Sequence, residues 1–537
     1  MMKGATDNSQ GVGQHEKLHR VISTPMMALL GLNAALGSAI LFSVAGITAS
    51  AGPAGIISFL IGAVLFTVIA LTQLELSKTF PEAGAPARYP FYTHGEFANL
   101  INSFASIIWY IFIPPFEGFA VIEGINFFWP VMINSSGFPT LVGIVVAVIA
   151  TLLFIPLNYF GSRLVGVSNA LAGIVKVCLY ALLGIGLLAV YHNSGNLVNY
   201  GGFAPFGFAG ILAALPLVMF AYASARIIAD YAEEAKSIRV LKPAIAYLVL
   251  GQMLVYVLFD YVFLTGINWS ALGVTPGDWA KLSVVTTNPF ILLSSNAHLP
   301  VLVGIAFVIG IIGPFLTGYV YLGAGARVLL SAGRSGYVNQ RFTYLHAKYK
   351  VPNWAVVTFG VIGAILAFMT SPIPSIFSII DYALVGGYLG YSFSAVSMAA
   401  ARRQGLTKER FSDAGIIPAA SFAIGSLIVF WSGWPSVPYA LAILTAGVLV
   451  FGILFRVHRN IANGLWSVFY ILFLLIMTYI GSVGALDIVP FFAASFIVMV
   501  VSLVVFYPWG VLSSLHAVDA IKHYDEAHLS TGESVSK

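Results

Sequence analysis

The chain has 537 residues, of which 59% are hydrophobic and 8% are charged. Soluble domains carry about 25% charged residues, so this composition excludes an ordinary water-soluble protein. The formal net charge is +5, and the single cysteine, Cys178, excludes an intramolecular disulfide and a multi-cysteine metal site.

Apolar runs of roughly 18 to 25 residues recur from end to end, and each is long enough to cross a hydrocarbon core about 30 Å thick. The chain begins with a polar segment that lacks the apolar stretch of a secretory signal. The pattern therefore predicts an all-α polytopic membrane protein with about fourteen spans. The predicted spans lie near residues 24–49, 53–77, 98–129, 139–159, 165–191, 208–233, 243–267, 299–332, 353–371, 375–400, 415–432, 437–455, 465–483 and 488–508.

The basic residues predict the orientation of these spans. An even number of spans places both termini on one side, and nearly all Lys and Arg residues then fall on that side. The exceptions are Lys281 in an opposite loop and Lys176 and Arg226 within spans. By the positive-inside rule we expect both termini in the cytoplasm and a multi-pass protein of the plasma membrane. The basic surplus orients the bundle and does not indicate a nucleic-acid partner.

Two spans carry small or helix-breaking residues near their middles. The first reads "GLNAALGSAILFSVAG" from Gly31, and the sixth reads "LPLVMFAYASARIIADYAEEAKS" from Leu215. The offset of five spans is the one expected of a five-plus-five inverted repeat with a binding site at the membrane midplane, although small residues also serve helix packing. The corresponding domains are a tail at 1–23, repeats at 24–191 and 208–400, accessory spans at 415–508 and a tail at 509–537.

Three segments carry a resemblance to the amino acid, polyamine and organocation (APC) transporter superfamily. The run "ALGSAILFSVAG" from Ala35 resembles the break in that family's first span, and "FAYASARIIADYAEEAKSIRVLKPAI" from Phe220 resembles its sixth span. The stretch "GARVLLSAGRSGYVNQRFTYLHAKYKVPNWAV" from Gly325 resembles the exit of its eighth span. The resemblance covers roughly residues 24–400 and implies an amino acid permease with a LeuT-like fold, in which the first and sixth helices are broken.

The resemblance also implies a substrate site at the two breaks. An unwound helix exposes N–H groups that bind a carboxylate and carbonyl groups that bind an ammonium, so a zwitterion suits such a site. The amides of Gly37, Ser38 and Ala39 would hold the substrate carboxylate. The carbonyls near Phe220, Ala221 and Ser224 would take the amino group, and Phe220 or Tyr222 would cap the pocket.

This sequence departs from the family pattern at several of these positions. Ala39 stands where the family usually has its second glycine, and its methyl group narrows the pocket. Ser224 and Ala225 replace a glycine and an aromatic residue, and Arg226 stands where the family often has an acidic residue. The identity of the substrate is therefore left open.

Several ionisable residues lie within the predicted spans. Lys176 is too deep in the fifth span to reach water easily, and relatives coupled to protons can place a lysine there, so it is our candidate for the proton-coupling group. The alternative is a structural lysine bonded to carbonyls of the broken first helix. Glu117 and Glu123 are possible pathway carboxylates, of which one at most lines the pathway because they do not share a helix face. Asp260 is a further buried candidate. Asp230, Glu233, Glu234 and Lys236 belong either to an inner gate or to a solvated helix end.

The sequence thus predicts a secondary active transporter that imports amino acids by alternating access, with the proton as coupling ion. An exchanger and a polyamine or organic-cation transporter stay open as alternatives, and a transporter-like nutrient sensor and a membrane-embedded enzyme represent other classes. We expect no cofactor or metal, because the histidines form no paired ligand motif. The oligomeric state cannot be deduced from the sequence.

Overall fold

The computed structural model describes residues 17–192, 194–284, 288–370, 376–407, 410 and 415–522. Helices dominate this part of the chain, and its only extended pairings are three isolated bridges. Eleven stretches of the described residues are long and apolar enough to cross a membrane, and three shorter apolar helices accompany them. The prediction of an all-helical polytopic membrane protein is confirmed. The count of about fourteen spans stays a prediction.

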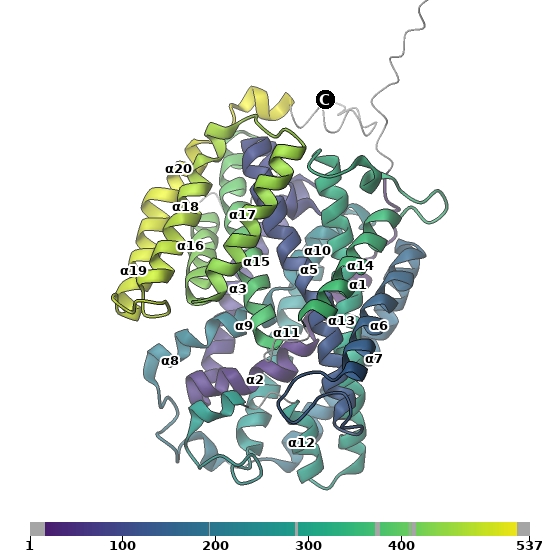
Figure 1. Ribbon diagram of the computed structural model, residues 1–537, viewed down its shortest axis with the longest axis vertical. Helices are drawn as coiled ribbons and strands as arrows, with labels where there is room; N and C mark the ends of the chain where they lie inside the picture. The colour runs from purple at the N-terminus through teal and green to yellow at the C-terminus, as the bar shows by residue number, and fades with distance from the viewer. Residues whose placement is uncertain are drawn as a thin grey trace, which may run out of the picture.

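The helices follow the chain in three groups, which Figure 1 colours from purple to yellow. The first group is α1 (Thr24–Ala35), α2 (Ser38–Ala51), α3 (Gly55–Thr79), α4 (Tyr89–His94), α5 (Glu96–Asn126), α6 (Leu141–Tyr159) and α7 (Ser162–Val190). The second is α8 (Gly207–Ala213), α9 (Leu215–Tyr222), α10 (Ala225–Asp230), α11 (Leu241–Gly266), α12 (Pro289–Asn296), α13 (Pro300–Arg334), α14 (Asn353–Thr370) and α15 (Ile376–Arg403). The third is α16 (Ile416–Trp431), α17 (Ser436–Leu454), α18 (Ile461–Ile480), α19 (Phe491–Val501) and α20 (Tyr507–Leu512).

Helix α5 forms the centre of the bundle. It packs along α13 and α15, and polar side chains on it bond to neighbouring backbone. The Asn102 amide donates to the carbonyl oxygen of Pro86 at 2.8 Å, and the Ser103 hydroxyl donates to that of Ala87 at 2.8 Å. A Cβ on Gly387 of α15 would lie 2.4 Å from the Trp109 ring, so glycine is what permits α15 to approach α5 this closely. Helices α16 to α20 lie along one side of the bundle (Figure 1).

The first and sixth predicted spans are interrupted. Helix α1 ends at Ala35 and α2 begins at Ser38, while α9 ends at Tyr222 and α10 begins at Ala225. A Cβ on Gly37 would lie 2.4 Å from the Thr317 hydroxyl oxygen, so no larger residue fits between α1 and α2. The halves pack crosswise, with α1 against α10 and α2 against α9. The inverted repeat stays a prediction.

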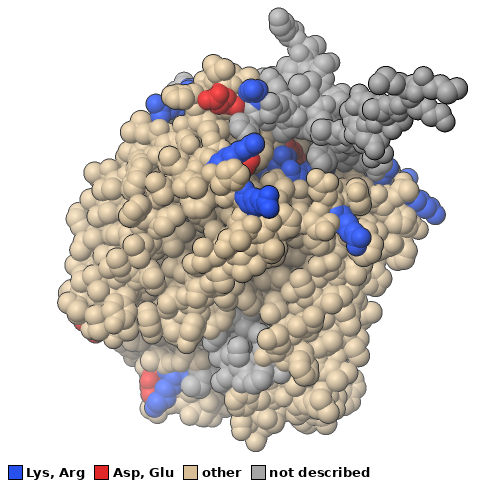
Figure 2. All heavy atoms as spheres, turned by 45° about the horizontal axis from the view of Figure 1, so that its top comes forward, with Lys and Arg blue, Asp and Glu red and all other residues tan. Residues whose placement is uncertain are grey.

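The two ends of the bundle differ in charge. Lys and Arg side chains gather at the end that stands at the top of Figure 1, and tilting this end forward in Figure 2 shows the blue groups distributed over it. We call it the basic end and define it by Lys236, Arg239, Arg341 and Arg456, which lie in the connections between α10 and α11, α13 and α14, and α17 and α18. The opposite end carries α12 and the exposed ion pair of Lys281 with Asp278, 2.6 Å apart.

Candidate functional site

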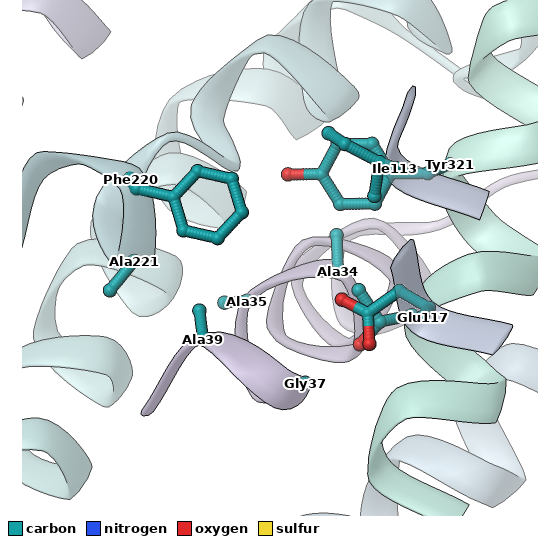
Figure 3. A pocket seen from close by; sticks show the side chains of 10 residues that line it. Ala34, Ala35, Gly37, Ala39, Ile113, Glu117, Phe220, Ala221 and Tyr321 are labelled. Atoms are coloured by element: carbon teal, nitrogen blue, oxygen red, sulfur yellow. The ribbon is translucent and has the colours of Figure 1, made fainter. Parts of the chain in front are cut away.

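A pocket lies between the two interruptions, in the interior of the bundle. Helices α1, α2, α5, α9 and α13 supply its walls. In Figure 3 the Phe220 ring and Tyr321 face one another across one side of the pocket, and Glu117 and Gly37 lie together on the other. The lining residues are Ala34, Ala35, Gly37, Ala39, Ile113, Glu117, Phe220, Ala221, Thr317 and Tyr321.

The carboxylate of Glu117 lies at the N-terminus of α2. The Ser38 backbone N–H donates to Glu117 Oε2 at 3.3 Å, and the Ser38 hydroxyl donates to Oε1 at 2.8 Å. The first N–H groups of a helix have no partner within the helix, and its dipole favours negative charge there. An internal carboxylate therefore occupies part of the anion site that the sequence assigned to a substrate.

The Lys176 ammonium lies beside the pocket residue Thr317. Its Nζ donates to the carbonyl oxygens of Asn33 at 2.8 Å and Gly313 at 3.0 Å, and to the Thr317 hydroxyl oxygen at 3.1 Å. Thr317 in turn donates to the carbonyl oxygen of Asn33 at 2.8 Å. Three oxygens from α1 and α13 thus surround one buried cation. This geometry is compatible with both predicted roles of Lys176, the proton-coupling group and the structural lysine.

Two tyrosines hold the chain ends at the interruptions. The Tyr256 hydroxyl of α11 lies 2.7 Å from the carbonyl oxygen of Ala35 and 2.8 Å from that of Ala221. Its single proton is shared by these two acceptors, so the hydroxyl bridges the last turn of α1 and the last turn of α9, where carbonyl groups lack a helical partner. The Tyr180 hydroxyl donates to the carbonyl oxygen of Gly37 at 3.3 Å. Both contacts satisfy backbone groups that unwinding leaves unpaired in an apolar environment.

The structure brings together most of the residues that the sequence assigned to the site. Gly37, Ala39, Phe220, Ala221 and Glu117 line the pocket, and Ser38 bonds to Glu117 at its edge.

Other assigned residues lie elsewhere. Tyr222 is buried against the rings of Phe59, Phe66 and Tyr256 and is not among the lining residues. The Ser224 hydroxyl accepts a hydrogen bond from the Gln252 amide at 2.8 Å. Glu123 lies six residues beyond Glu117 on α5, is partly exposed and does not line the pocket.

Asp260 is buried on α11, outside the pocket. Its oxygens lie close to the start of α3, where a Cβ on Gly55 would be 3.4 Å from Oδ2. Neither oxygen has a hydrogen-bond partner among the described residues.

Sequence reasoning missed Thr317, Tyr321, Tyr256 and Tyr180. They lie on α7, α11 and α13, which are mostly apolar and continuous, so no break in a helix marks them. The only signal available was the rule that polar groups inside membrane spans face the bundle interior. That rule does not say which partner each of them meets.

Ion pairs close the bundle between the pocket and the basic end. Arg327 forms a two-contact pair with Glu234, in which the NH2 group lies 2.8 Å from Oε2, and it stacks over the Tyr231 ring. The NH1 group of Arg334 lies 2.7 Å from Glu233. These contacts place Glu233 and Glu234 in a packed closure, so they do not form a solvated helix end.

The segment before α1 takes part in the same closure. The backbone N–H of Leu18 donates to one oxygen of Glu233 at 3.0 Å, and that of Ala83 donates to the other at 2.9 Å. Burial alone would raise the pKa of Glu233, but Arg334 and the two N–H groups together hold that pKa below its ordinary value.

The described residues contain no group of three or more His, Cys, Asp or Glu side chains that could hold a metal ion. The polar groups in and beside the pocket include the N-terminus of α2, backbone carbonyl groups, the Glu117 carboxylate and the Lys176 ammonium. Such groups recognise a small zwitterion through opposite ends of the same molecule.

Comparisons with known proteins agree with this chemistry. The sequence pattern of the family described as amino acid permease matches residues 22–430. The glutamate/serine transporter AimA of Bacillus subtilis is 27% identical over 541 residues, which cover 96% of this chain and 98% of that protein. The aspartate-proton symporter of the same organism is 26% identical, covering 85% and 89%, respectively. Its branched-chain amino acid permease BcaP is 24% identical, covering 86% and 98%.

Proposed function

Because this chain belongs to the amino acid permease family and is an amino acid transporter, we propose that it imports amino acids by alternating access and couples their uptake to protons. The proposal places the basic end in the cytoplasm and the protein in the plasma membrane. The positive-inside rule supports this orientation.

The Lys176 ammonium carries the coupling part of the proposal. Its Nζ lies 2.8 Å from the carbonyl oxygen of Asn33 in the last turns of α1 and 3.0 Å from that of Gly313 in α13, and the side chain is buried next to the interruption of the first span. Carbonyl and hydroxyl oxygens bind a protonated amine, whereas a neutral amine donates fewer hydrogen bonds. Protonation of Lys176 would therefore strengthen the link between α1 and α13, and its loss would free α1 to move.

Glu117 supports the same mechanism from the substrate side. Its carboxylate accepts a hydrogen bond from the Ser38 N–H at the start of α2, which is the group proposed to bind the substrate carboxylate. Two carboxylates at one helix N-terminus repel each other. A substrate carboxylate would bind there only if Glu117 moved away or took up a proton, and either event links substrate binding to a change at the centre of the bundle.

The pocket supports a small amino acid as substrate. The amide of Ser38 faces the substrate carboxylate in this proposal, the carbonyl of Ala221 its ammonium and the ring of Phe220 its side chain. Two of the relatives are named for glutamate, serine and aspartate, so we include small and acidic amino acids in the proposed substrate class.

The experiment is uptake of a radiolabelled amino acid mixture into proteoliposomes with an inward proton gradient, repeated after an ionophore has collapsed the gradient. We expect accumulation only with the gradient. Uptake that requires amino acid inside the vesicles would replace the proposal by exchange. Uptake of a polyamine in place of amino acids would contradict the substrate class.

A further inference from the structure

Arg226 is a buried cation for which the proposed mechanism has no use. It belongs to α10, directly after the second interruption, and its side chain is 0% exposed. One NH2 group donates to the Ser106 hydroxyl of α5, and the guanidinium lies over the Tyr110 ring at 5.7 Å. Its Nε and NH1 groups have no hydrogen-bond partner among the described residues.

Asp230 lies one helical turn further along α10 and is equally buried. The Tyr110 hydroxyl donates to its Oδ2, while Oδ1 has no partner in the described part of the chain. Arg226 and Asp230 thus carry opposite charges on one helix face, each with polar atoms left open. Residues four apart lie above one another on a helix, so the open atoms share one region.

An arrangement of this kind is unfavourable in a closed protein. Buried charges are normally paired and hydrogen-bonded, and an open donor or acceptor inside the membrane costs free energy. The ion pairs of Arg327 and Arg334 close to the basic end show that this bundle satisfies buried arginines elsewhere. Open groups on both partners therefore indicate a ligand that carries a carboxylate and an ammonium.

The pair lies between the pocket and the closure at the basic end. Ser106 and the pocket residue Ile113 are seven positions apart on α5, a rise of about 10 Å. Tyr110 and the pocket residue Tyr321 are in ring contact at 5.8 Å between the two levels. A Cβ on Gly390 of α15 would lie 2.5 Å from Arg226 NH1, so the guanidinium packs directly against the α15 backbone, and only glycine permits this approach.

We propose that Arg226 and Asp230 form a second binding station for the amino acid, which the substrate occupies on its way from the pocket to the basic end. The free N–H groups of Arg226 take the carboxylate and the free oxygen of Asp230 takes the ammonium. Passage requires the Tyr110 and Tyr321 rings and the Arg327 ion pair to separate. The inference rests on the proposed function, because it assumes an amino acid moving through this bundle.

The station predicts an effect that depends on the side from which substrate binds. The pocket is reached from the opposite end without passing Arg226, whereas substrate binding from the basic end meets Arg226 and Asp230 first. Removing their charges should therefore weaken apparent affinity measured from the basic end. It should leave affinity measured from the opposite end nearly unchanged.

The test is the KM of proton-driven amino acid uptake in right-side-out and inside-out membrane vesicles. For the double variant Arg226→Gln and Asp230→Asn, which leaves no lone charge, we expect the KM from the basic end to rise about tenfold and the other KM to stay within about twofold. Arg239→Gln removes an exposed arginine at the same end and is the matched control, for which neither KM should change.

A second variant keeps the test independent of the stability of the first. Ser106→Asp places a carboxylate within reach of Arg226 and satisfies the cation internally. It should raise the KM from the basic end in the same way by competing with the substrate. Equal changes in both KM values, or no change in either, would show a purely structural role. If wild-type vesicles transport no amino acid from either side even with a proton gradient, the proposed function fails, not the station.

Discussion

The Nζ of Lys176 lies 2.8 Å from the carbonyl oxygen of Asn33, two residues before α1 ends. This hydrogen bond joins the middle of α7 to the part of the first span that the proposed alternating-access movement would displace. The Lys176 ammonium is hydrogen-bonded inside the bundle, so the side chain does not extend toward water. The proposed coupling to protons depends on this contact.

Replacing Lys176 by alanine tests the coupling directly. We expect Lys176→Ala to bind substrate but to lose accumulation driven by a proton gradient, because the charge that alternates between two states is gone. Uptake into proteoliposomes with and without the gradient measures this. Lys281→Ala, at the exposed ion pair of the opposite end, is the control and should accumulate substrate as the wild type does. Unchanged gradient dependence in Lys176→Ala would refute the coupling role.

The Glu117→Gln variant tests the internal carboxylate. The amide oxygen of glutamine can still accept from Ser38, but the negative charge at the N-terminus of α2 is lost. A charge at this position is worth about 1 kcal/mol, so we expect the Kd for the amino acid at neutral pH to fall about fivefold. Isothermal titration calorimetry on purified protein gives this constant. Weaker binding in Glu117→Gln would instead assign Glu117 to the direct binding of the substrate ammonium.

Tyr256 and its neighbour Tyr222 provide a test and a matched control for the contact between the two interruptions. Tyr256 bridges Ala35 and Ala221 through its hydroxyl, whereas the Tyr222 hydroxyl has no hydrogen-bond partner among the described residues. Removing a partner of a buried acceptor costs roughly 1 to 3 kcal/mol, so Tyr256→Phe should lower the melting temperature and raise the KM. Tyr222→Phe should change neither. Thermal unfolding in detergent and uptake kinetics measure both effects, and equal effects of the two substitutions would argue against the bridge.

The closure at the basic end should weaken in acid. The pKa of Glu233 lies below its ordinary value of 4.5 when the protein is folded. The ionised carboxylate therefore adds stability that is complete above this ordinary value and is lost as the pH falls through the lower folded pKa. We expect Glu233→Gln to unfold at a lower temperature than the wild type at pH 7, and we expect the difference between the two to shrink steadily as the pH falls below 4.5. A difference that does not depend on pH would mean that the side chain acts through packing alone.

The predicted and observed positions of the helices along the sequence agree closely. Hydropathy located the helices to within a few residues, as for α5, which was expected at 98–129 and spans Glu96–Asn126. The glycine and serine of the first span indicated an interruption where α1 ends and α2 begins. Local composition determines these features, because the length of an apolar run and the conformational freedom of Gly37 need no distant partner.

The rotation of each helix could not be deduced in this way. In a membrane bundle the face toward lipid and the face toward the core are both apolar, so sequence gives little indication of which side chains point inward. Tyr222 was expected at the pocket, but it lies against Phe59 and Phe66. Tyr256 came from a continuous helix that gave no signal, and it joins the two interruptions.

The sequence by itself determined that this chain is a helical membrane protein of a transporter type, with a weak point in its first span and a lysine too deep to be solvated. Only the tertiary structure decided that Lys176 meets Asn33 and that Glu117 occupies the Ser38 amide. It also decided that Arg226 and Asp230 keep polar atoms without a partner among the described residues, between the pocket and the basic end. Each of these depends on segments far apart in the chain, and the free energy of a buried charge is set by the groups that folding brings within hydrogen-bond distance of it.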